Sequence, residues 1–454
     1  MDSQQSPGNL MKPLVRLTLA CSLALAGSAL HAHMPDPAFT APSSTAQRLY
    51  AEARKDLLQI RVLVSNGRAQ SSVGSGFLLG DTNLVVTNYH VIAEIAQEPE
   101  TYSGEYLDTS GRRGSLELVA LDVLRDLAIV RVDRHGSGAF QLLEPSAQLA
   151  QGEYLYALGN PLDLGFAISE GTYNGVVRRD FSDLLLFSGA LNPGMSGGPS
   201  ITSSGQVAGV NVSHRRDGEL VSFLVPVSYL QALLDTVGDT PPEDFSPMIA
   251  AQLLEHQEQM VDRLLETPLS QKQLGNHLVP VRESDQLRCR GSADTQRRSG
   301  YSVDRIHCAM ESNVFVSSNL RTGQVSINHN LIGRGELDRW RFARTARQLY
   351  SHQVARPHQH AVLSGPACTE DFIDSNGLAL RAVLCFNAYN KLEGLYTLDL
   401  FSVTTDDPDN ALLSQLRMRG VSWDNGLRLA GAFLGGLQAA PTDTQANPAR
   451  QEQP

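Results

Sequence analysis

The chain has 454 residues, enough for two or three domains and at least one large hydrophobic core. Apolar residues make up 42% and charged residues 19%, a globular composition that excludes a low-complexity or collagen-like chain. Against 37 Lys and Arg stand 48 Asp and Glu, so the formal net charge is −11. Tight binding of polyanions needs a basic surface, so nucleic acid and anionic lipid are not expected partners.

The first 32 residues have the pattern of a secretory signal peptide. Lys12 and Arg16 form a positive start, the apolar run 17–30 follows, and small residues precede an expected cut after Ala32. The alternative, a membrane anchor, needs roughly 20 apolar residues. This run has 14. We therefore expect export to the periplasm or full secretion, and no stable membrane span.

Residues 46–238 are predicted to form an all-β domain after a flexible leader, 33–45. Residues 46–58 favour a short entry helix, and about ten β-branched runs separated by Gly, Asn and Asp follow between residues 60 and 227. Such spacing is typical of an all-β barrel or sandwich pair. A closing helix is expected over 228–237.

A breaker-rich linker, 239–247, precedes a second domain over 248–440. Ser246 followed by Pro247 predicts a helix start, and the helix carries an apolar stripe that packs on its own domain or on an oligomer partner. Mixed strands are expected next, and two helices separated by Gly420 over 409–437. We therefore predict an α+β accessory domain of no recognised type, followed by a disordered tail, 441–454.

Four cysteines remain once the signal, with Cys21, is removed. An even set in an exported chain predicts two disulfides. Of the three possible connectivities we favour Cys289 with Cys308 and Cys368 with Cys385. Spacings of 19 and 17 residues do not fit a four-cysteine zinc site, so no metal is expected.

An arginine-rich segment around Trp340 is the one local feature that suggests nucleic acid. Its apolar residues share one helical face, so a solvated amphipathic helix is the favoured interpretation. The predicted apolar face consists of Leu337, Trp340, Ala343, Ala346 and Leu349. Three nearby histidines, His352, His358 and His360, lack companion carboxylates or thiolates at metal spacing.

The most informative segment is GALNPGMSGGPS, residues 189–200, in which glycines surround Ser196. A nucleophilic serine needs a tight turn that exposes its hydroxyl while backbone N–H groups, here those of Gly194 and Ser196, face the developing oxyanion. The same pattern matches the nucleophile elbow of α/β-hydrolases, but an elbow leads into a helix and the residues after Ser196 have hairpin character.

Suitable partners of Ser196 lie upstream of it. His90 ends the strand-like run LVVTNYH, and Asp126 directly precedes the run LAIVRV. Both therefore lie at strand ends, where a barrel rim brings side chains together. The order His, Asp, Ser fits a chymotrypsin-like double barrel rather than an α/β-hydrolase.

Four ordered blocks, GSGFLL…VVTNYHVI, RDLAIVRV, LGNPL…GTYNGVV and NPGMSGGPSI, resemble the trypsin-like serine peptidases of the HtrA/Deg type. The resemblance covers about residues 45–238 and implies two six-stranded barrels with the site between them. It further implies a triad of His90, Asp126 and Ser196. After residue 240 no PDZ-like carboxylate-binding loop is recognisable.

The resemblance also implies a specificity pocket with Ala190 at its base and Asn211, Val212 and Ser213 along its edge. No acidic residue lies at the base, so cleavage after small or medium aliphatic residues is expected. Met195 replaces the Asp with which zymogen-type trypsins bind a new N-terminus. The oxyanion loop must then be ordered by packing or by a partner.

The resulting hypothesis is an exported serine endopeptidase that acts on unfolded or specific envelope or extracellular proteins and needs no cofactor. Two alternatives remain open. One is a proteolytically silent peptide-binding or chaperone-like module, and the other is an esterase-like hydrolase on the same fold. The second domain is expected to mediate homo-oligomer or regulatory contacts, to bind substrates, or to cover the cleft.

Overall fold

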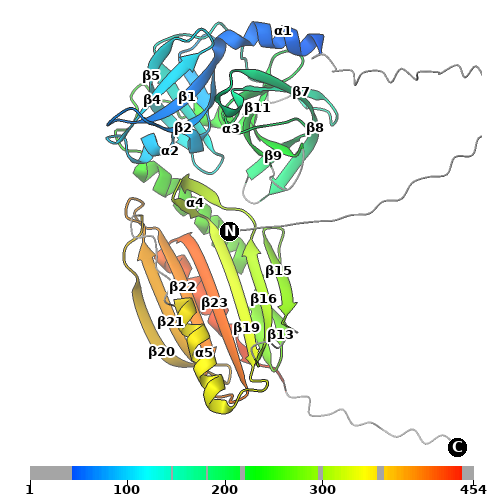
Figure 1. Cartoon of the computed structure of the whole chain (residues 1–454), viewed down its shortest axis with the longest axis vertical. Helices are drawn as coiled ribbons and strands as arrows, with labels where there is room; N and C mark the ends of the chain where they lie inside the picture. The colour runs from blue at the N-terminus through cyan, green and yellow to red at the C-terminus, as the bar shows by residue number, and fades with distance from the viewer. Residues whose placement is uncertain are drawn as a thin grey trace, which may run out of the picture. The chain divides into compact units, whose positions relative to one another are not determined.

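A computed structural model describes residues 43–144, 147–179, 182–214, 220–294, 300–354 and 362–441 (Figure 1). The expected signal peptide, nearly all of the leader and the tail lie outside these ranges, as do His358 and His360. The described helices include none that combines the length and apolar character required to cross a membrane.

Two closed six-stranded barrels form the first half of this structure, as the sequence predicted. In the first, the spatial order is β1-β2-β3-β6-β5-β4, and in the second it is β10-β11-β12-β9-β8-β7. The strands are β1 (Leu57–Val64), β2 (Gln70–Leu78), β3 (Leu84–Thr87), β4 (Tyr102–Asp108), β5 (Arg113–Asp122), β6 (Leu127–Val132), β7 (Tyr154–Gly159), β8 (Ala167–Arg179), β9 (Ser182–Phe187), β10 (Pro199–Ile201), β11 (Val207–His214) and β12 (Ser222–Pro226).

The barrels share one hydrophobic cluster, because strands of each present apolar side chains on the face turned toward the other. Phe77 and Ile129 of the first barrel pack in this cluster with Leu158 and Val210 of the second. Burial at about 25 cal/mol per Å² of apolar surface makes this contact a major source of stability. The cluster thus holds the two barrels, and the site between them, in one arrangement.

Short helices close the barrels. They are α1 (Ser44–Ala53), the 3-10 turn η1 (Arg54–Asp56), α2 (Tyr89–Gln97), the 3-10 turn η2 (Pro161–Asp163) and α3 (Val227–Leu234). The entry helix therefore begins inside the predicted leader and ends earlier than expected, because Leu57 and Leu58 are fully buried as the first residues of β1.

The second half is an α+β domain built on a seven-stranded antiparallel sheet of order β15-β16-β19-β23-β22-β21-β20. Its elements, with two smaller sheets (β13-β14-β24 and β17-β18), are α4 (Ser246–Leu265), β13 (Ser270–Leu274), β14 (His277–Val281), β15 (Leu287–Ala293), β16 (Ser302–Met310), β17 (Val314–Ser317), β18 (Leu320–Thr322), β19 (Gln324–Gly333), α5 (Arg339–Val354), β20 (Ala367–Ser375), β21 (Leu378–Ala388), β22 (Tyr396–Thr404), β23 (Asn410–Val421), α6 (Trp423–Gly435) and β24 (Gln438–Ala439).

One predicted helix of this domain is wrong. Residues 410–421 are the central strand β23, paired with β19 and β22, and only α6 after them is helical. Both faces of β23 are covered, since Met260 of α4 and Phe433 of α6 pack on one side and Phe342 of α5 packs on the other. A strand buried on both faces loses its alternating pattern, so the sequence did not reveal it.

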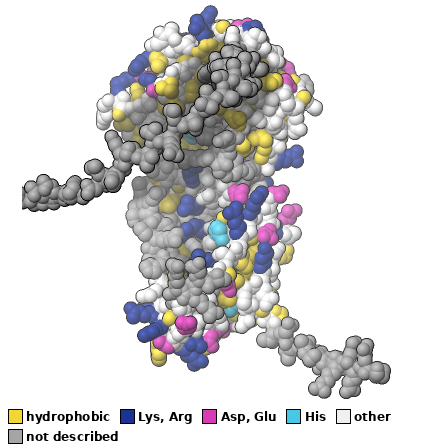
Figure 2. All heavy atoms as spheres, turned by 45° about the vertical axis from the view of Figure 1, so that its right-hand side comes forward, with side chains coloured by type: hydrophobic (Ala, Val, Ile, Leu, Met, Phe, Trp, Pro, Cys, Tyr) yellow, Lys and Arg dark blue, Asp and Glu magenta, His cyan; other side chains and the backbone are white. Residues whose placement is uncertain are grey.

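Helix α5 occupies the arginine-rich segment, as predicted, but its buried face differs from the expected one. Phe342, Ala346 and Tyr350 are buried, whereas Trp340 is 88% exposed. The buried residues recur every four residues along α5, which lies in front of the sheet in Figure 1. On the face shown in Figure 2, basic and acidic side chains are interspersed among the described residues.

The second domain packs directly on α2 of the first barrel. The buried hydroxyl of Tyr89 donates to the carbonyl of Val316 at 2.7 Å, and Gln97 Nε2 donates to the same oxygen at 2.5 Å. Ile92 of α2 and Leu253 of α4 belong to one hydrophobic cluster that also includes Val316. The helix that follows β3 is therefore part of both domain cores.

Two disulfides link the cysteines in the sequence-adjacent pairing, Cys289 with Cys308 and Cys368 with Cys385. Each joins directly paired positions, on β15 with β16 and on β20 with β21. Since β15 and β20 are the edge strands of the seven-stranded sheet, each disulfide anchors one edge.

Removing the Cys368–Cys385 disulfide should destabilise the second domain. The bond closes a loop of 17 residues, and a loop of that size corresponds to about 3 kcal/mol in the chain-entropy account. We expect the double substitution Cys368→Ala, Cys385→Ala to lower the denaturant midpoint, measured by far-UV circular dichroism. The matched control is the same variant in dithiothreitol, where the remaining disulfide is also lost. An unchanged midpoint in the oxidised variant contradicts the prediction.

Candidate active site between the barrels

His90 and Asp126 come together where β3 leads into α2. His90 Nδ1 lies 2.6 Å from Asp126 Oδ2, and the backbone N–H of His90 donates to Asp126 Oδ1 at 2.8 Å. The Asp126 carbonyl accepts from Tyr89 N–H at 3.2 Å and from Asn88 Nδ2 at 2.7 Å. Asp126 has φ of 56°, a left-handed conformation that Asp tolerates better than most residues. Four hydrogen bonds thus set the imidazole against the carboxylate.

The surroundings of His90 favour its protonated form. The side chains of His90 and Asp126 are 31% and 22% exposed. Burial lowers the pKa of His90, but the charge of Asp126 and its hydrogen bond outweigh burial and raise that pKa above the ordinary value. Glu94 adds to the rise and Arg321 of β18 opposes it. The pair is therefore suited to stabilise an imidazolium.

Ser196 lies in a tight turn that both barrels hold. Met195 N–H donates to Asn192 O at 3.0 Å and Gly198 N–H to Met195 O at 3.1 Å. Ser75 of β2 reaches across from the first barrel, with its hydroxyl donating to Gly194 O at 2.6 Å and its N–H to Ser196 O at 2.8 Å. The turn therefore cannot shift without breaking contacts between the barrels.

Two backbone N–H groups of this turn, those of Gly194 and Ser196, have no acceptor among the described residues. The carbonyl of Pro193 accepts from Leu162 N–H at 2.8 Å. In a trans peptide the N–H points opposite to the carbonyl, so Gly194 N–H is turned away from Leu162. Met195 is 2% exposed and packs in the core of the second barrel. Packing within the chain thus orders this turn.

The glycines show how closely the Ser196 turn approaches the start of α2. A Cβ added at Gly197, where φ is +85°, would lie 2.2 Å from Ser75 O and 2.9 Å from Asn88 N. A Cβ at Gly74 would meet both Val91 and the carbonyl of Ser196, at 2.5 Å and 3.1 Å. The residues on either side of His90 therefore adjoin the residues around Ser196.

The Ser196 hydroxyl donates to the carbonyl of Val212 at 3.2 Å, at a bulge of β11. In this structure its hydrogen bond is thus to the backbone, and a bond to His90 requires the hydroxyl to turn away from Val212. Catalytic hydrogen bonds often tighten and align only in the Michaelis complex, so a triad is compatible with this geometry.

The other residues expected at the site differ in position. Ala190 is exposed. Asn211 is fully buried below the turn, where Nδ2 donates to Leu158 O at 2.9 Å and Oδ1 accepts from Ser200 at 2.7 Å. Its side chain therefore supports the turn and does not line a pocket edge. Ser213 belongs to β11, opposite Phe223.

Sequence reasoning missed the supporting residues Ser75, Asn88 and Asn160. Ser75 lies within β2, whereas Asn88 and Asn160 directly follow β3 and β7. The fold alone brings these polar residues to the turn or to Asp126. The Asn160 N–H donates to Ser75 Oγ at 2.9 Å. The only sequence signal for any of these residues was the motif NYH, in which Asn88 stands two residues before His90.

A metal site is not indicated in the described part of the chain, where no group of three potential ligands is found. The buried His329 of the second domain bonds Ser414 Oγ at 2.8 Å and Pro280 O at 2.7 Å through its two ring nitrogens. Burial lowers its pKa to about 4, so it is neutral and structural.

Residues 74–210 match the family model of the trypsin-like peptidase domain. The double barrel is a trypsin-like peptidase domain. This confirms the family expected from the motifs. HhoA of Synechocystis sp., whose name assigns it to the serine proteases, is 28% identical over 192 residues, covering 40% of this chain and 46% of HhoA. A protein of Chlamydia trachomatis named as a DegP-like periplasmic serine endoprotease is 32% identical over 145 residues, covering 31% and 28%.

This chain therefore spans less than half the length of these two relatives. Among solved structures, a serine endoprotease from Yersinia pestis aligns at 22% identity and a TM-score of 0.37, covering 43% of this chain and 66% of that one. The residues matched by the family model, 74–210, end before the second domain begins.

Gly197→Ala should disable the Ser196 turn. The added Cβ collides with the backbone of β2 and of the α2 start, so the turn must move. We expect the rate at which a fluorophosphonate probe labels Ser196 to fall at least ~100-fold, since probe reactivity needs an ordered oxyanion site. Gly205→Ala is the control. There φ is +90° but the added Cβ meets only Leu49, at 3.7 Å, so about 1 kcal/mol of strain is the only expected cost. Equal labelling of both variants would contradict this account.

Proposed function

We propose that this chain is an exported serine endopeptidase with Ser196 as nucleophile, His90 as general base and acid, and Asp126 as the residue that orients and stabilises His90. The single observation that carries the proposal is the His90–Asp126 pair at the edge of the Ser196 turn. His90 Nδ1 lies 2.6 Å from Asp126 Oδ2, and two N–H groups of the turn have no acceptor among the described residues. That combination supplies proton transfer and oxyanion binding in one place.

The chemistry follows from these groups. Ser196 Oγ attacks the scissile carbonyl carbon while His90 Nε2 takes the hydroxyl proton, and the N–H groups of Gly194 and Ser196 bind the oxyanion. The C–N bond then breaks and His90 gives the proton to the departing amine. Water repeats the same steps on the acyl-enzyme. The carboxylate of Asp126 stabilises the imidazolium in both halves.

Substrate preference is proposed from the same site. Ala190 offers no charge for a basic side chain, which favours small or medium aliphatic residues at the cleaved position. An extended chain would add as a strand beside Asn211, Val212 and Ser213, which favours unfolded or flexible polypeptide.

Export is proposed on two observations. Residues 1–32 have a signal-peptide pattern, and disulfides anchor both edges of the second-domain sheet. Disulfides of this structural kind persist in oxidising compartments such as the periplasm. Substrates would then be envelope or extracellular proteins. Oligomer or regulatory contacts through the second domain remain a prediction.

One observation favours a second candidate function, a peptide-binding module without turnover. Ser196 donates to Val212 O and not to His90. If that bond persisted with peptide bound, the hydroxyl proton would not reach the base and the cleft would hold peptides uncleaved.

A fluorophosphonate probe separates the two functions. We expect the wild-type protein to be labelled at Ser196 and to cleave casein, and Ser196→Ala to lose both, with turnover reduced on the order of 10³-fold or more. Circular dichroism of both proteins controls for folding. Wild-type protein that is folded yet unlabelled supports the silent module, and labelling with hydrolysis of a small ester but not of casein supports an esterase.

Replacing Asp126 should lower the pKa of His90. In Asp126→Asn the burial that disfavours the imidazolium remains, while the main influence that raises the pKa is gone. We expect an NMR titration of His90, in the Ser196→Ala background, to show protonation only at lower pH than in Ser196→Ala alone. Glu94→Gln, which removes a weaker influence of the same sign, should give a smaller decrease. An unchanged titration in Asp126→Asn rules out the proposed charge coupling.

A further inference from the structure

The hairpin β17-β18 of the second domain lies beside the His90–Asp126 pair. The ring of Phe315 stands edge-on to His90, with centroids 6.1 Å apart, and edge-on to Tyr89 at 6.4 Å. The guanidinium of Arg321 lies 5.3 Å from the centre of the Phe315 ring. The bonds from Tyr89 and Gln97 to Val316 O hold the hairpin there. The second domain therefore reaches the site without closing it, since His90 is 31% exposed.

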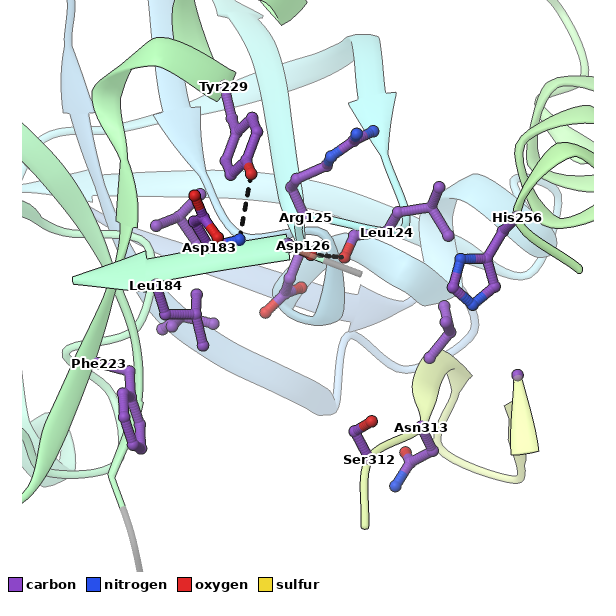
Figure 3. Close-up of a pocket in the computed structure, with 15 residues that line it drawn as sticks. Leu124, Arg125, Asp126, Asp183, Leu184, Phe223, Tyr229, His256, Ser312 and Asn313 are labelled. Carbon is purple, nitrogen blue, oxygen red and sulfur yellow. Dashed lines mark hydrogen bonds between the residues drawn. The ribbon is translucent and has the colours of Figure 1, made fainter. Parts of the chain in front are cut away.

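A cavity of about 300 Å³ lies between this hairpin and the second barrel, and Asp126 is in its wall (Figure 3). A volume of this size is at the lower end for small-ligand sites and exceeds what one aliphatic side chain needs. The barrel side includes Leu184 of β9, Val212 of β11 and Phe223 of β12, and the facing side includes Ser312, Asn313 and Val314.

We propose that the second domain completes the substrate cleft, and that residues 312–314 form one wall of a subsite for an apolar substrate side chain. The inference rests on the proposed endopeptidase function. Val212 is the residue whose carbonyl bonds Ser196, so the cavity begins at the strand segment on which an extended substrate would lie. A side chain of the substrate half paired with β11 projects from that strand into the cavity.

The residues that line the cavity favour an apolar substrate side chain, with a backbone N–H or carbonyl of the substrate beside it. Leu184, Val212, Phe223 and Val314 present aliphatic and aromatic surface. The hydroxyl of Ser312 is buried and has no hydrogen-bond partner among the described residues. A buried hydroxyl without a partner costs free energy, which a peptide N–H or carbonyl entering the cavity would relieve.

A basic occupant is the competing possibility within the same pocket. Asp183 lines the cavity next to Tyr229, whose hydroxyl accepts from the Asp183 N–H at 3.1 Å (Figure 3). Arg125 already supplies positive charge at this end, with its guanidinium 5.2 Å from the centre of the Tyr229 ring. That guanidinium is paired with Asp122 at 3.3 Å, so charge alone does not decide between the two occupants. The aliphatic and aromatic lining of the cavity favours an apolar side chain, which we therefore assign.

The experiment fills the cavity from the second-domain side. A positional library of fluorogenic peptides first identifies the position at which the full-length wild-type protein prefers Leu or Phe over Ala. In Asn313→Trp the ratio of kcat/KM for the Leu peptide to that for the Ala peptide should fall at least ~10-fold, as expected when a pocket no longer fits a side chain. Asn319→Trp is the control, because Asn319 is exposed between β17 and β18, in the hairpin that follows Asn313, and does not line this cavity.

A second variant tests the opposite change. Val314→Ala should widen the subsite and shift the preference at that position toward Phe and Trp. Labelling of Ser196 by the fluorophosphonate keeps the two hypotheses distinct. A labelled, peptide-cleaving protein whose Leu/Ala ratio is the same in Asn313→Trp and wild type overturns this inference alone. A preference for Arg or Lys that Asp183→Asn removes overturns the apolar assignment, and a folded, unlabelled wild type overturns the proposed function and this inference with it.

Discussion

The structure of the site depends on the way Asp126 holds the first turn of α2. Its two carboxylate oxygens and its carbonyl together accept from the backbone of Tyr89 and His90, the imidazole of His90 and the amide of Asn88. A carboxylate so placed does two things at once. It fixes the position of the imidazole ring. It also stabilises the protonated ring at a half-buried position, where burial would otherwise favour the neutral form.

The turn around Ser196, in the second barrel, is held in place by β2 of the first barrel. Ser75 bonds the turn on both sides of Met195, and the burial of Met195 anchors it in the second barrel. A chain that relied on an ion pair from a newly cut N-terminus would carry an acidic residue at this position. Here the residue at this position is Met195, and its apolar packing fixes the turn within the core of the second barrel.

The second domain contacts the helix that carries His90, in addition to its covalent link to the barrels. Its hairpin is bonded through Val316 to α2, so the helix that carries His90 is stabilised from both domains. A domain connected in this way would transmit changes in its own packing to the position of the imidazole. It also brings residues such as Asn313 and Phe315, remote in sequence from the barrels, to the region where a substrate would lie.

The barrel strands, the turn around Ser196 and the candidate partners His90 and Asp126 could be predicted from the sequence, because glycine placement, β-branched runs and strand-end positions are local signals. It also indicated the pairing of the cysteines. It missed Ser75 and the supporting role of Asn211, and it predicted a helix where β23 lies. These three features became visible only in the folded chain, because each depends on contacts between distant segments. A strand covered on both faces has no period to recognise, and a polar side chain acquires its partner only when another part of the chain is folded against it.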